Sequence, residues 1–245
     1  MTKPPPSLRA TAMSLKIAFQ MDPMESLNIS GDSTFALMLS AQSRGYALWH
    51  YGPDDLSYED GRLRAAARPV SVRRVDGDHF SFGAPQTIDL GRDIDVIWMR
   101  QDPPFDLGYI TATHLLERVR GETLVMNDPE SVRNAPEKLF VLDYARFMPP
   151  TLITRSLAET RAFQAKHGEI VVKPLHGNAG SAVFHIGADG KNLAALTELF
   201  GTVWKEPFMV QAFLKSVAQG DKRIVLVDGV VAGAINRLPG KGEIR

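Results

Sequence analysis

The sequence predicts an α/β fold in two domains, with a parallel sheet and its helices first and a mostly antiparallel α+β domain second. Three observations support this prediction. Apolar, strand-like runs alternate with helical runs up to about Asn134, and beyond it strand-like runs follow one another across glycine-containing turns. The 245 residues are 44% hydrophobic and 23% charged, which allows a sizeable buried core in one large or two smaller domains.

The first half begins with a strand–helix–strand unit. Residues 15–20 (LKIAFQ) have the pattern of a buried strand, residues 32–45 (DSTFALMLSAQSRG) that of a helix, and residues 46–51 (YALWHY) that of a second strand. Asp32 is placed to cap the start of the helix, and Gly45 follows its end. Because strands joined through a helix pair in parallel, this unit indicates a parallel sheet.

The same alternation continues to the end of the first half. Residues 94–99 (IDVIWM) and 123–127 (TLVMN) are strand-like and flank a helical segment at residues 109–120. We therefore expect a Rossmann-like domain over residues 14–134. Residues 55–90 are polar and rich in turn signals, so we expect an irregular excursion from the sheet without chemistry of its own. Residues 1–13 contain three prolines and no hydrophobic centre, and are expected to be a disordered extension.

The second half begins with a helix at residues 156–168. Ser156 and Glu159 have the spacing of a capping box, and Gly168 ends the helix. The remaining predicted elements are a strand at 169–175, a glycine turn, a strand at 181–186, a helix at 192–200, a strand at 208–214, and a hairpin at 223–237 turned on Asp228-Gly229. This order predicts an antiparallel α+β domain over residues 135–245.

Composition and motif spacing exclude several function classes. Lys and Arg total 28, as do Asp and Glu, so no net charge attracts nucleic acid or a membrane surface, and no apolar run has the roughly 20 residues that cross a bilayer. The chain has no cysteine, which fits a reducing compartment and is consistent with a cytoplasmic location. Its six histidines lack metal-ligand spacing, and the sequence has no Walker, Rossmann-fingerprint, nucleophile-elbow or zinc-protease motif.

Residues 171–186 (VVKPLHGNAGSAVFHI) are the one segment whose pattern points to an anion. An ordinary hairpin explains the alternating flanks and the glycines. It does not explain Lys173, which lies on the same strand face as Val171 and just before a turn rich in backbone N–H donors. Such an arrangement suits a phosphate, in a strand–turn–strand setting.

Seven segments together resemble, in order and spacing, the prokaryotic glutathione synthetases of the ATP-grasp superfamily. They are QMDPMESLNISGDSTFALML, MRQDPPFD, VRNAPEKLF, VVKPLHGNAGSAVFHI, QAFL, GDKRIVLVDG and INRLPGKGEIR. The resemblance covers nearly all of the chain from Ser14 onward. It implies a Rossmann-like pre-ATP-grasp substrate domain over residues 14–134. It also implies an incomplete ATP-grasp domain over residues 135–245, cut within its lid.

The resemblance implies an ATP-dependent carbon–nitrogen ligase. ATP would phosphorylate the free carboxylate of γ-glutamylcysteine, and the amine of glycine would displace phosphate to give glutathione. By family motif, the nucleotide-binding residues would be Lys138, Lys173, Gly177, Asn178, Gly180, Ser181, Gln211, Ala212, Phe213, Leu214 and Asp221. The substrate-binding residues would be Arg100, Arg223, Arg237 and Arg245, and Arg223 and Arg237 would also be the catalytic residues. Guanidinium suits these roles because its planar fork pairs with a carboxylate in a bidentate way.

Magnesium is implied by the same resemblance, but its ligands are not in this chain. The family holds Mg²⁺ with Asp, Glu and Asn residues on later strands, so no metal ligand is assigned here. We therefore expect the 245 residues alone to be inactive and the hairpin at 223–237 to have an uncovered apolar surface. Ala179 and Ala182 also depart from the denser glycine turn of the family, and each added methyl restricts approach of the backbone to phosphate.

Each assignment has an ordinary structural alternative. Lys138 could be an exposed helix charge and Lys173 a solvated lysine at a strand end. Arg100 could be a polar strand terminus, and Arg223 an edge-strand charge. At the level of the whole chain, the alternatives are a non-catalytic nucleotide-binding remnant and another ATP-grasp ligase, for example a D-alanine or glutamate ligase. The MRQDPPFD segment argues against the last of these. The expected partners are γ-glutamylcysteine and glycine as substrates and further copies of the chain in a homo-oligomer.

Overall fold

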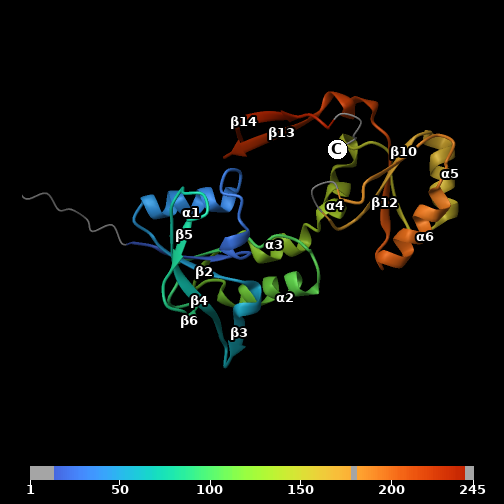
Figure 1. Cartoon of the computed structure of the whole chain (residues 1–245). Coiled ribbons are helices and arrows are strands. Elements are labelled where there is room, and N and C mark those ends of the chain that lie inside the picture. Colours follow the sequence, from blue (N-terminus) through green and yellow to red (C-terminus); the bar gives the residue numbers. More distant parts are fainter. Residues whose placement is uncertain (1–13, 178–180, 241–245) are drawn as a thin grey trace, which may run out of the picture. The chain divides into compact units, whose positions relative to one another are not determined.

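The computed structural model describes residues 14–177 and 181–240. The chain divides into two compact units, residues 1–135 and 136–245, and each is described by itself (Figure 1). The predicted disordered extension at residues 1–13 lies outside the described residues. No helix within the described ranges is long and apolar enough to span a membrane.

The first unit is built on one mixed sheet. Its strands are β1 (Lys16–Gln20), β2 (Ala47–Tyr51), β3 (Leu56–Glu59), β4 (Arg62–Val72), β5 (Phe80–Phe82), β6 (Gln86–Asp89), β7 (Val96–Met99) and β8 (Leu124–Met126). The order is β3-β4-β2-β1-β7-β8, with β5 and β6 also paired to β4. β2, β1, β7 and β8 run parallel, which confirms the predicted parallel sheet.

Two helices cover this sheet, one on each face. The helical elements of the unit are α1 (Ser33–Ser43), α2 (Leu107–Leu116), α3 (Pro129–Asn134) and the 3₁₀ turns η1 (Met24–Ser26), η2 (Pro53–Asp55) and η3 (Glu117–Val119). Phe35 of α1 packs in one core with Phe19 of β1. Leu116 of α2 packs in a second core with Ala18, the neighbour of Phe19. Because successive strand residues face opposite sides, α1 and α2 lie on opposite faces of the sheet.

The prediction for residues 55–90 is wrong. This segment forms four antiparallel strands, β3 to β6, that extend the parallel sheet beyond β2. The inward side chains of β4 include Leu63, Ala65 and Ala67, which are fully or almost fully buried. Alanines and arginines carry much of this alternation, and both are residue types that do not signal a strand. Antiparallel pairing at the edge of the sheet then organises a segment that is polar on its other face.

Asp32 caps α1 as the sequence predicts, and its removal should destabilise the first unit. The Asp32 Oδ1 atom accepts the backbone N–H of Phe35 at 2.6 Å. We expect Asp32→Ala to lower the free energy of unfolding by about 1 kcal/mol, because one N–H at the helix start loses its partner. Chemical denaturation would measure this. Asp32→Asn keeps a side-chain oxygen and should restore most of the loss; equal stability of the Ala variant and the parent would contradict the capping role.

The second unit contains a four-stranded antiparallel sheet, which confirms its predicted character. Its elements are α4 (Glu137–Phe140), η4 (Val141–Phe147), β9 (Thr151–Thr154), α5 (Leu157–His167), β10 (Ile170–Pro174), β11 (Phe184–Ile186), α6 (Leu193–Val203), β12 (Phe208–Ala212), η5 (Lys215–Gln219), β13 (Asp221–Val227) and β14 (Val230–Arg237). The strand order is β11-β10-β12-β9, and β10 pairs antiparallel with both neighbours.

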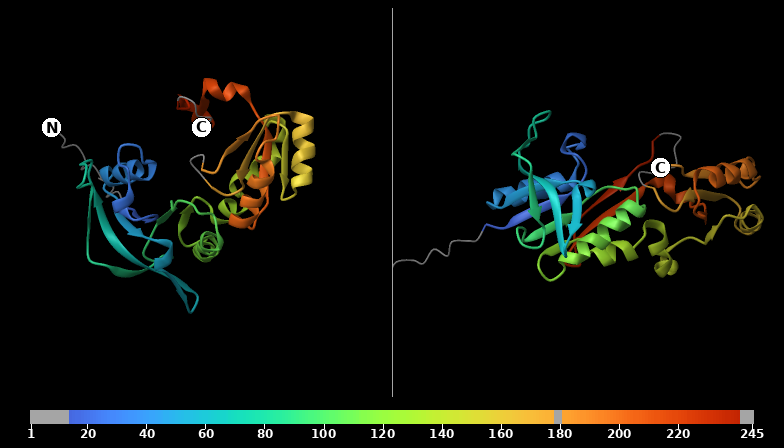
Figure 2. Two further views of the ribbon diagram at one scale, coloured as in Figure 1. Left: turned by 45° about the vertical axis from the view of Figure 1, so that its right-hand side comes forward. Right: turned by 90° about the horizontal axis from the view of Figure 1, so that it is seen from below.

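The two faces of this sheet have different surroundings. Ile170 and Val172 of β10 are buried with Leu196 and Phe200 of α6, and the partly buried Phe163 of α5 packs on the same core. α5 and α6 therefore cover one face (Figure 2). Val171 and Lys173 alternate with the core residues and belong to the other face.

The predicted capping box at the start of α5 is only half formed. Ser156 Oγ accepts the N–H of Glu159 at 3.3 Å, as expected. The reciprocal bond is replaced, because the Ser156 N–H donates to Thr154 Oγ1 at 3.0 Å and the Glu159 carboxylate accepts the Thr154 hydroxyl. Thr154, two residues before the cap, thus supplies the acceptor that the sequence pattern assigns to Glu159.

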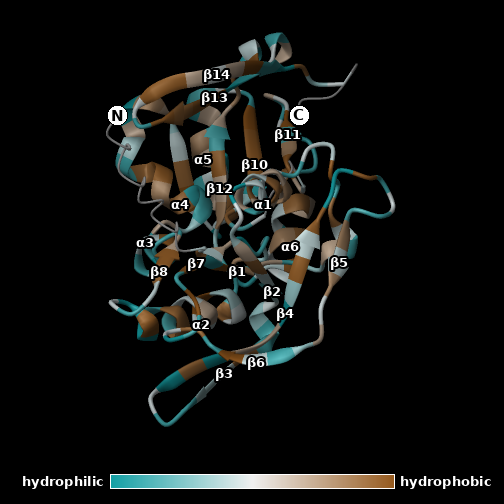
Figure 3. Ribbon diagram, turned by 90° about the vertical axis from the view of Figure 1, so that its left-hand side faces the viewer, coloured by the Kyte–Doolittle hydropathy of each residue, from teal (hydrophilic) through white to brown (hydrophobic). Residues whose placement is uncertain are grey.

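β13 and β14 form a separate two-stranded hairpin. Asp228 and Gly229 have φ of 49° and 77°, both positive as a type I′ turn requires, which confirms the predicted turn. All residues of both strands are exposed, although many are apolar. Figure 3 shows hydrophobic colours along much of β14.

Candidate functional site

The start of the glycine turn is held by two neighbouring residues of α4. Lys138 Nζ donates to the carbonyl of Gly177 at 2.7 Å and to that of Leu175 at 3.2 Å. The Gly177 N–H donates to Glu137 Oε2 at 2.8 Å. Lys138 therefore lies at the start of the turn. The Gly177 N–H, predicted to meet a ligand, is bonded to a protein carboxylate in this conformation.

Lys173 lies on the open face of the sheet next to Gln211. Its Nζ atom donates to Gln211 Oε1 at 2.6 Å, and Gln211 Nε2 in turn donates to Thr151 Oγ1 at 2.9 Å. Burial, followed by repulsion from the Lys138 ammonium, lowers the pKa of Lys173. A partly buried ammonium that is bonded to a neutral amide and repelled by a second ammonium is a group that an anion would stabilise.

A cavity of about 300 Å³ opens beside Lys173 and Gln211. Its lining residues are Pro149, Val171, Lys173, Val183, Gln211, Ala212, Phe213, Leu214, Ser216, Val217, Gly220 and Asp221. Six of them are among the predicted nucleotide-binding residues: Lys173, the four residues 211–214, and Asp221. The cavity is thus mainly apolar, with Lys173 and Asp221 as the charged residues of its lining, and a flat apolar group attached to an anion would suit its apolar part and its lysine.

The rest of the predicted nucleotide site is placed only in part. Ser181 is described and exposed. Asn178 and Gly180 lie outside the described residues, as does Ala179. Ala182 has φ of 54°, a positive value that a residue with a Cβ adopts at a cost.

The predicted arginines of the hairpin lie near the cavity's acidic residue. Arg237 Nε donates to Asp221 Oδ2 at 3.0 Å, and a second guanidinium nitrogen bonds the same oxygen. Asp221 and Arg237 are opposite each other in the register of β13 and β14, and Arg223 follows two residues later, opposite Ile235. Arg223 is exposed. Arg245 lies outside the described residues.

Arg100 belongs to the first unit, just past the carboxyl end of β7. Its Nε donates to Thr34 Oγ1 and its Nη2 to Ser33 Oγ, both at 3.0 Å. These bonds direct the guanidinium toward the start of α1. Nearby in sequence, burial and then the carboxylates of Asp22 and Asp32 raise the pKa of Asp102, against an opposing effect of Arg100.

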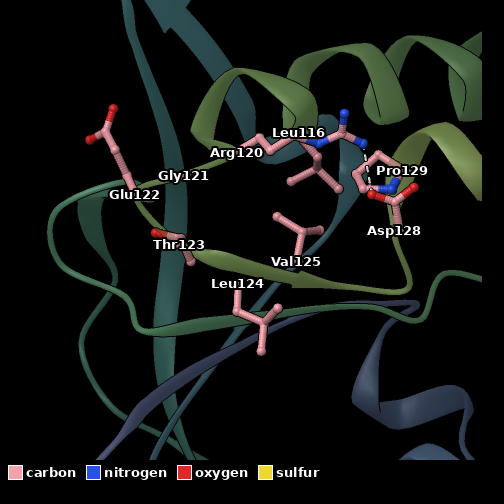
Figure 4. Close-up of a pocket in the computed structure, with 9 residues that line it drawn as sticks. All are labelled: Leu116, Arg120, Gly121, Glu122, Thr123, Leu124, Val125, Asp128 and Pro129. Carbon is pink, nitrogen blue, oxygen red and sulfur yellow. Dashed lines mark hydrogen bonds and ion pairs between the residues drawn. The ribbon is translucent and has the colours of Figure 1, made fainter.

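The first unit has two further cavities. One, of about 550 Å³, lies near the carboxyl ends of the parallel strands, and its lining includes the aspartates Asp22, Asp54, Asp102 and Asp106. Figure 4 shows the other, of about 340 Å³, beside β8. There Arg120 points to Asp128 and pairs with it at 2.7 Å, while Glu122 points away. Arg120 also pairs with Glu130, so its charge is already matched, and we assign this cavity no chemistry.

Sequence reasoning missed Val183 and Val217 in the lining of the second unit's cavity, and it missed the bond between Glu137 and the glycine turn. Val171 was placed correctly on the Lys173 face, but Val183 and Val217 carried no chemical signal. The period of two along β10 was the one usable signal for the wall, since it separates Val171 from the core residues. Glu137 could not be distinguished from an ordinary first-turn acid of a helix.

The described residues contain no cluster that could hold a magnesium ion by itself. Mg²⁺ prefers octahedral oxygen ligation and is commonly held by one or two carboxylates together with substrate phosphates. Within the ranges 14–177 and 181–240, no group of three or more His, Asp or Glu side chains could hold a metal ion. We therefore assign no reaction step to magnesium.

Comparison with known proteins agrees with the fold. The N-terminal domain of prokaryotic glutathione synthetase matches residues 15–133, and the ATP-grasp domain of the same proteins matches residues 137–245. The chain is 52% identical over 233 residues to a glutathione synthetase from Rhodopseudomonas palustris, covering 95% of this chain and 74% of that protein. It is 41% identical to the Yersinia pestis glutathione synthetase, covering 94% and 73%.

Solved structures show the same fold at low sequence identity. A D-cycloserine synthetase is similar with a TM-score of 0.62 and 18% identity, covering 91% of this chain and 68% of that one. A RimK domain ATP-grasp protein from Sphaerobacter thermophilus gives 0.59 and 17%, covering 91% and 72%. The α/β unit followed by the second, antiparallel unit thus has the fold of ATP-grasp proteins. Within that class, the chain belongs to the prokaryotic glutathione synthetase family.

Proposed function

We propose that this chain serves ATP-dependent ligation of γ-glutamylcysteine to glycine, and that its second unit binds the ATP. The observation that carries the proposal is the grouping of Lys138, Lys173 and Gln211 around the glycine turn and an apolar cavity. Lys138 and Gln211 are 73 positions apart in the sequence, so the fold brings this group together. The name of the family relatives supports the choice of glutathione as product.

The second unit would bind ATP in two parts. Backbone groups of residues 211–214 would meet the edge of the base, while Val171, Val183 and Phe213 would contact its faces. Lys138 and Lys173 would neutralise the phosphates, because charge-assisted hydrogen bonds to phosphate are strong in a partly buried site. The Gly177 N–H would become available to phosphate once Glu137 releases it.

The reaction then proceeds by two displacements. The carboxylate of γ-glutamylcysteine attacks the terminal phosphorus of ATP, ADP leaves, and an acyl phosphate forms. The amine of glycine attacks the acyl carbon, inorganic phosphate leaves, and the amine loses a proton. We propose that Arg223 and Arg237 stabilise the charged oxygens in these steps, and that Arg100 and Arg245 bind substrate carboxylates. For this, Arg237 must exchange Asp221 for a substrate oxygen.

The test is glycine-dependent phosphate release. About a quarter of the R. palustris relative lies outside the matched region. Two proteins would be assayed: the 245 residues alone, and the 245 residues joined to that unmatched segment of the relative. We expect the joined chain to release phosphate from ATP only when γ-glutamylcysteine and glycine are both present. We expect the 245 residues assayed alone to be inactive, because the family resemblance places the magnesium ligands outside them. ATP binding without glycine-dependent turnover in the joined chain would instead support a non-catalytic nucleotide-binding protein.

ATP affinity should fall as the pH rises into the alkaline range. The fall should occur at a lower pH than the ordinary pKa of a lysine would give. Burial and Lys138 lower the pKa of Lys173, so as pH rises its ammonium becomes a neutral amine early. The charge that attracts phosphate is present below that pKa and is lost above it. Because bound phosphate raises the pKa again, ATP binding should take up protons in this window.

Titration calorimetry over a range of alkaline pH, in buffers of different ionisation enthalpy, would measure both effects. Lys173→Arg keeps its charge throughout this range and should remove the decline. The same decline in the Arg variant would assign it to another group.

A further inference from the structure

Phe213, in the lining of the second unit's cavity, is contacted by residues that do not line the cavity themselves. Phe213 lines this cavity directly after the end of β12. Its backbone N–H donates to the carbonyl of Glu169 at 2.9 Å. Glu169 follows Gly168, whose φ of 79° ends α5 and turns the chain into β10. The main chain of Phe213 is thereby fixed, but this bond alone does not fix its ring.

The ring of Phe213 is held by His185. The imidazole lies against it with 4.2 Å between ring centroids and 34° between the ring planes. His185 Nε2 donates to Glu169 Oε2 at 2.9 Å, so the imidazole is itself held by the residue that binds the Phe213 backbone. Lys215 lies 3.6 Å from the other carboxylate oxygen of Glu169. Glu169 thus binds the backbone of Phe213 through its carbonyl and the imidazole of His185 through its carboxylate.

The strand register places His185 on the cavity face of the sheet. His185 is directly opposite Val171 in the β10–β11 pair, and Val171 is opposite Gln211 in the β10–β12 pair. Opposite residues of paired strands share a face, so these three side chains form one row. Val171 and Gln211 line the cavity, and His185 continues the row to the outer strand β11. Its side chain is 31% exposed.

We propose that His185, held by Glu169, is a positioning residue that sets the Phe213 ring as a wall for the base of the nucleotide. This inference rests on the proposed binding of ATP. Loss of the His185–Phe213 contact should therefore weaken binding of the base and leave binding of the phosphates unchanged. A ring that stacks on Phe213 should be able to replace the imidazole.

The experiment measures binding of ATP and of inorganic tripolyphosphate to the 245-residue chain by calorimetry. We expect His185→Ala to weaken ATP about three- to tenfold, the range of an aromatic pair contact, and to change tripolyphosphate less than about twofold. His185→Phe keeps a ring and should bind ATP nearly as the parent does. His185→Gln keeps a polar tip without a ring and should resemble the Ala variant. Lys173→Ala is the matched control and should weaken both ligands.

Each outcome decides a different point. Unchanged ATP affinity in His185→Ala, or equal loss for ATP and tripolyphosphate, overturns the positioning role. Failure of the parent to bind ATP overturns the proposed function and, with it, this inference. Thermal unfolding would show which variants fold; if His185→Ala does not, the comparison of the Phe and Gln variants decides, and equal ATP affinity in those two overturns the proposal.

Discussion

Lys173→Ala should reduce the affinity for ATP by about 10- to 100-fold while the chain stays folded. Hydrogen bonds to charged groups contribute about 1.5–3 kcal/mol each, which corresponds to this range. The ammonium of Lys173 bonds to the neutral amide of Gln211 rather than to a carboxylate there. A phosphate that binds Lys173 therefore replaces a neutral hydrogen-bond acceptor at this point, not a carboxylate. Calorimetric titration with ATP would measure the loss.

The matched control for this variant is Lys191→Ala. Lys191 belongs to the same unit, but its side chain is 84% exposed and pairs with Asp189 on the surface. Such pairs contribute little, so neither ATP affinity nor stability should change appreciably. Equal affinity in Lys173→Ala and the parent would remove Lys173 from the nucleotide site. A similar loss in both alanine variants would show a general effect of charge instead.

The fold was predictable where apolar side chains repeat with a clear period. Phe19 and its strand neighbours, with the capped helix after Asp32, define the strand–helix–strand unit without ambiguity. The antiparallel extension was not predictable, because two of the five buried positions of β4 are Ala65 and Ala67, and alanine favours no strand. Tertiary pairing decides such a segment, and a single sequence does not show it.

The candidate site shows the same division. Lys173 and Gln211 are 38 residues apart in the chain, and their contact depends on strand register, yet the family resemblance selects both. Glu169 and His185 were not selected, because a glutamate after a helix and a histidine on an edge strand are common. Their significance appears only when β10 and β11 pair and bring the imidazole against Phe213.

The β13–β14 hairpin should cause the 245-residue chain to self-associate. Seven of its apolar side chains are each more than half exposed: Ile224, Val225, Leu226, Val227, Val230, Val231 and Ile235. A two-stranded hairpin has only marginal stability in water, and an apolar patch of this kind favours contact with another apolar surface. Sedimentation velocity should show a sedimentation coefficient that rises with concentration across the micromolar range.

The double variant Leu226→Lys/Val231→Glu tests this assignment. The two residues are directly opposite each other in the hairpin, so the introduced charges can pair across the strands while the apolar surface shrinks. We expect the variant to sediment as a monomer at concentrations where the parent associates. Tyr58→Glu changes a side chain in the first unit that is also 50% exposed, and should leave association unchanged. If Tyr58→Glu abolishes self-association as effectively as the double variant, the surface through which the copies associate lies outside the hairpin. That result would contradict the assignment.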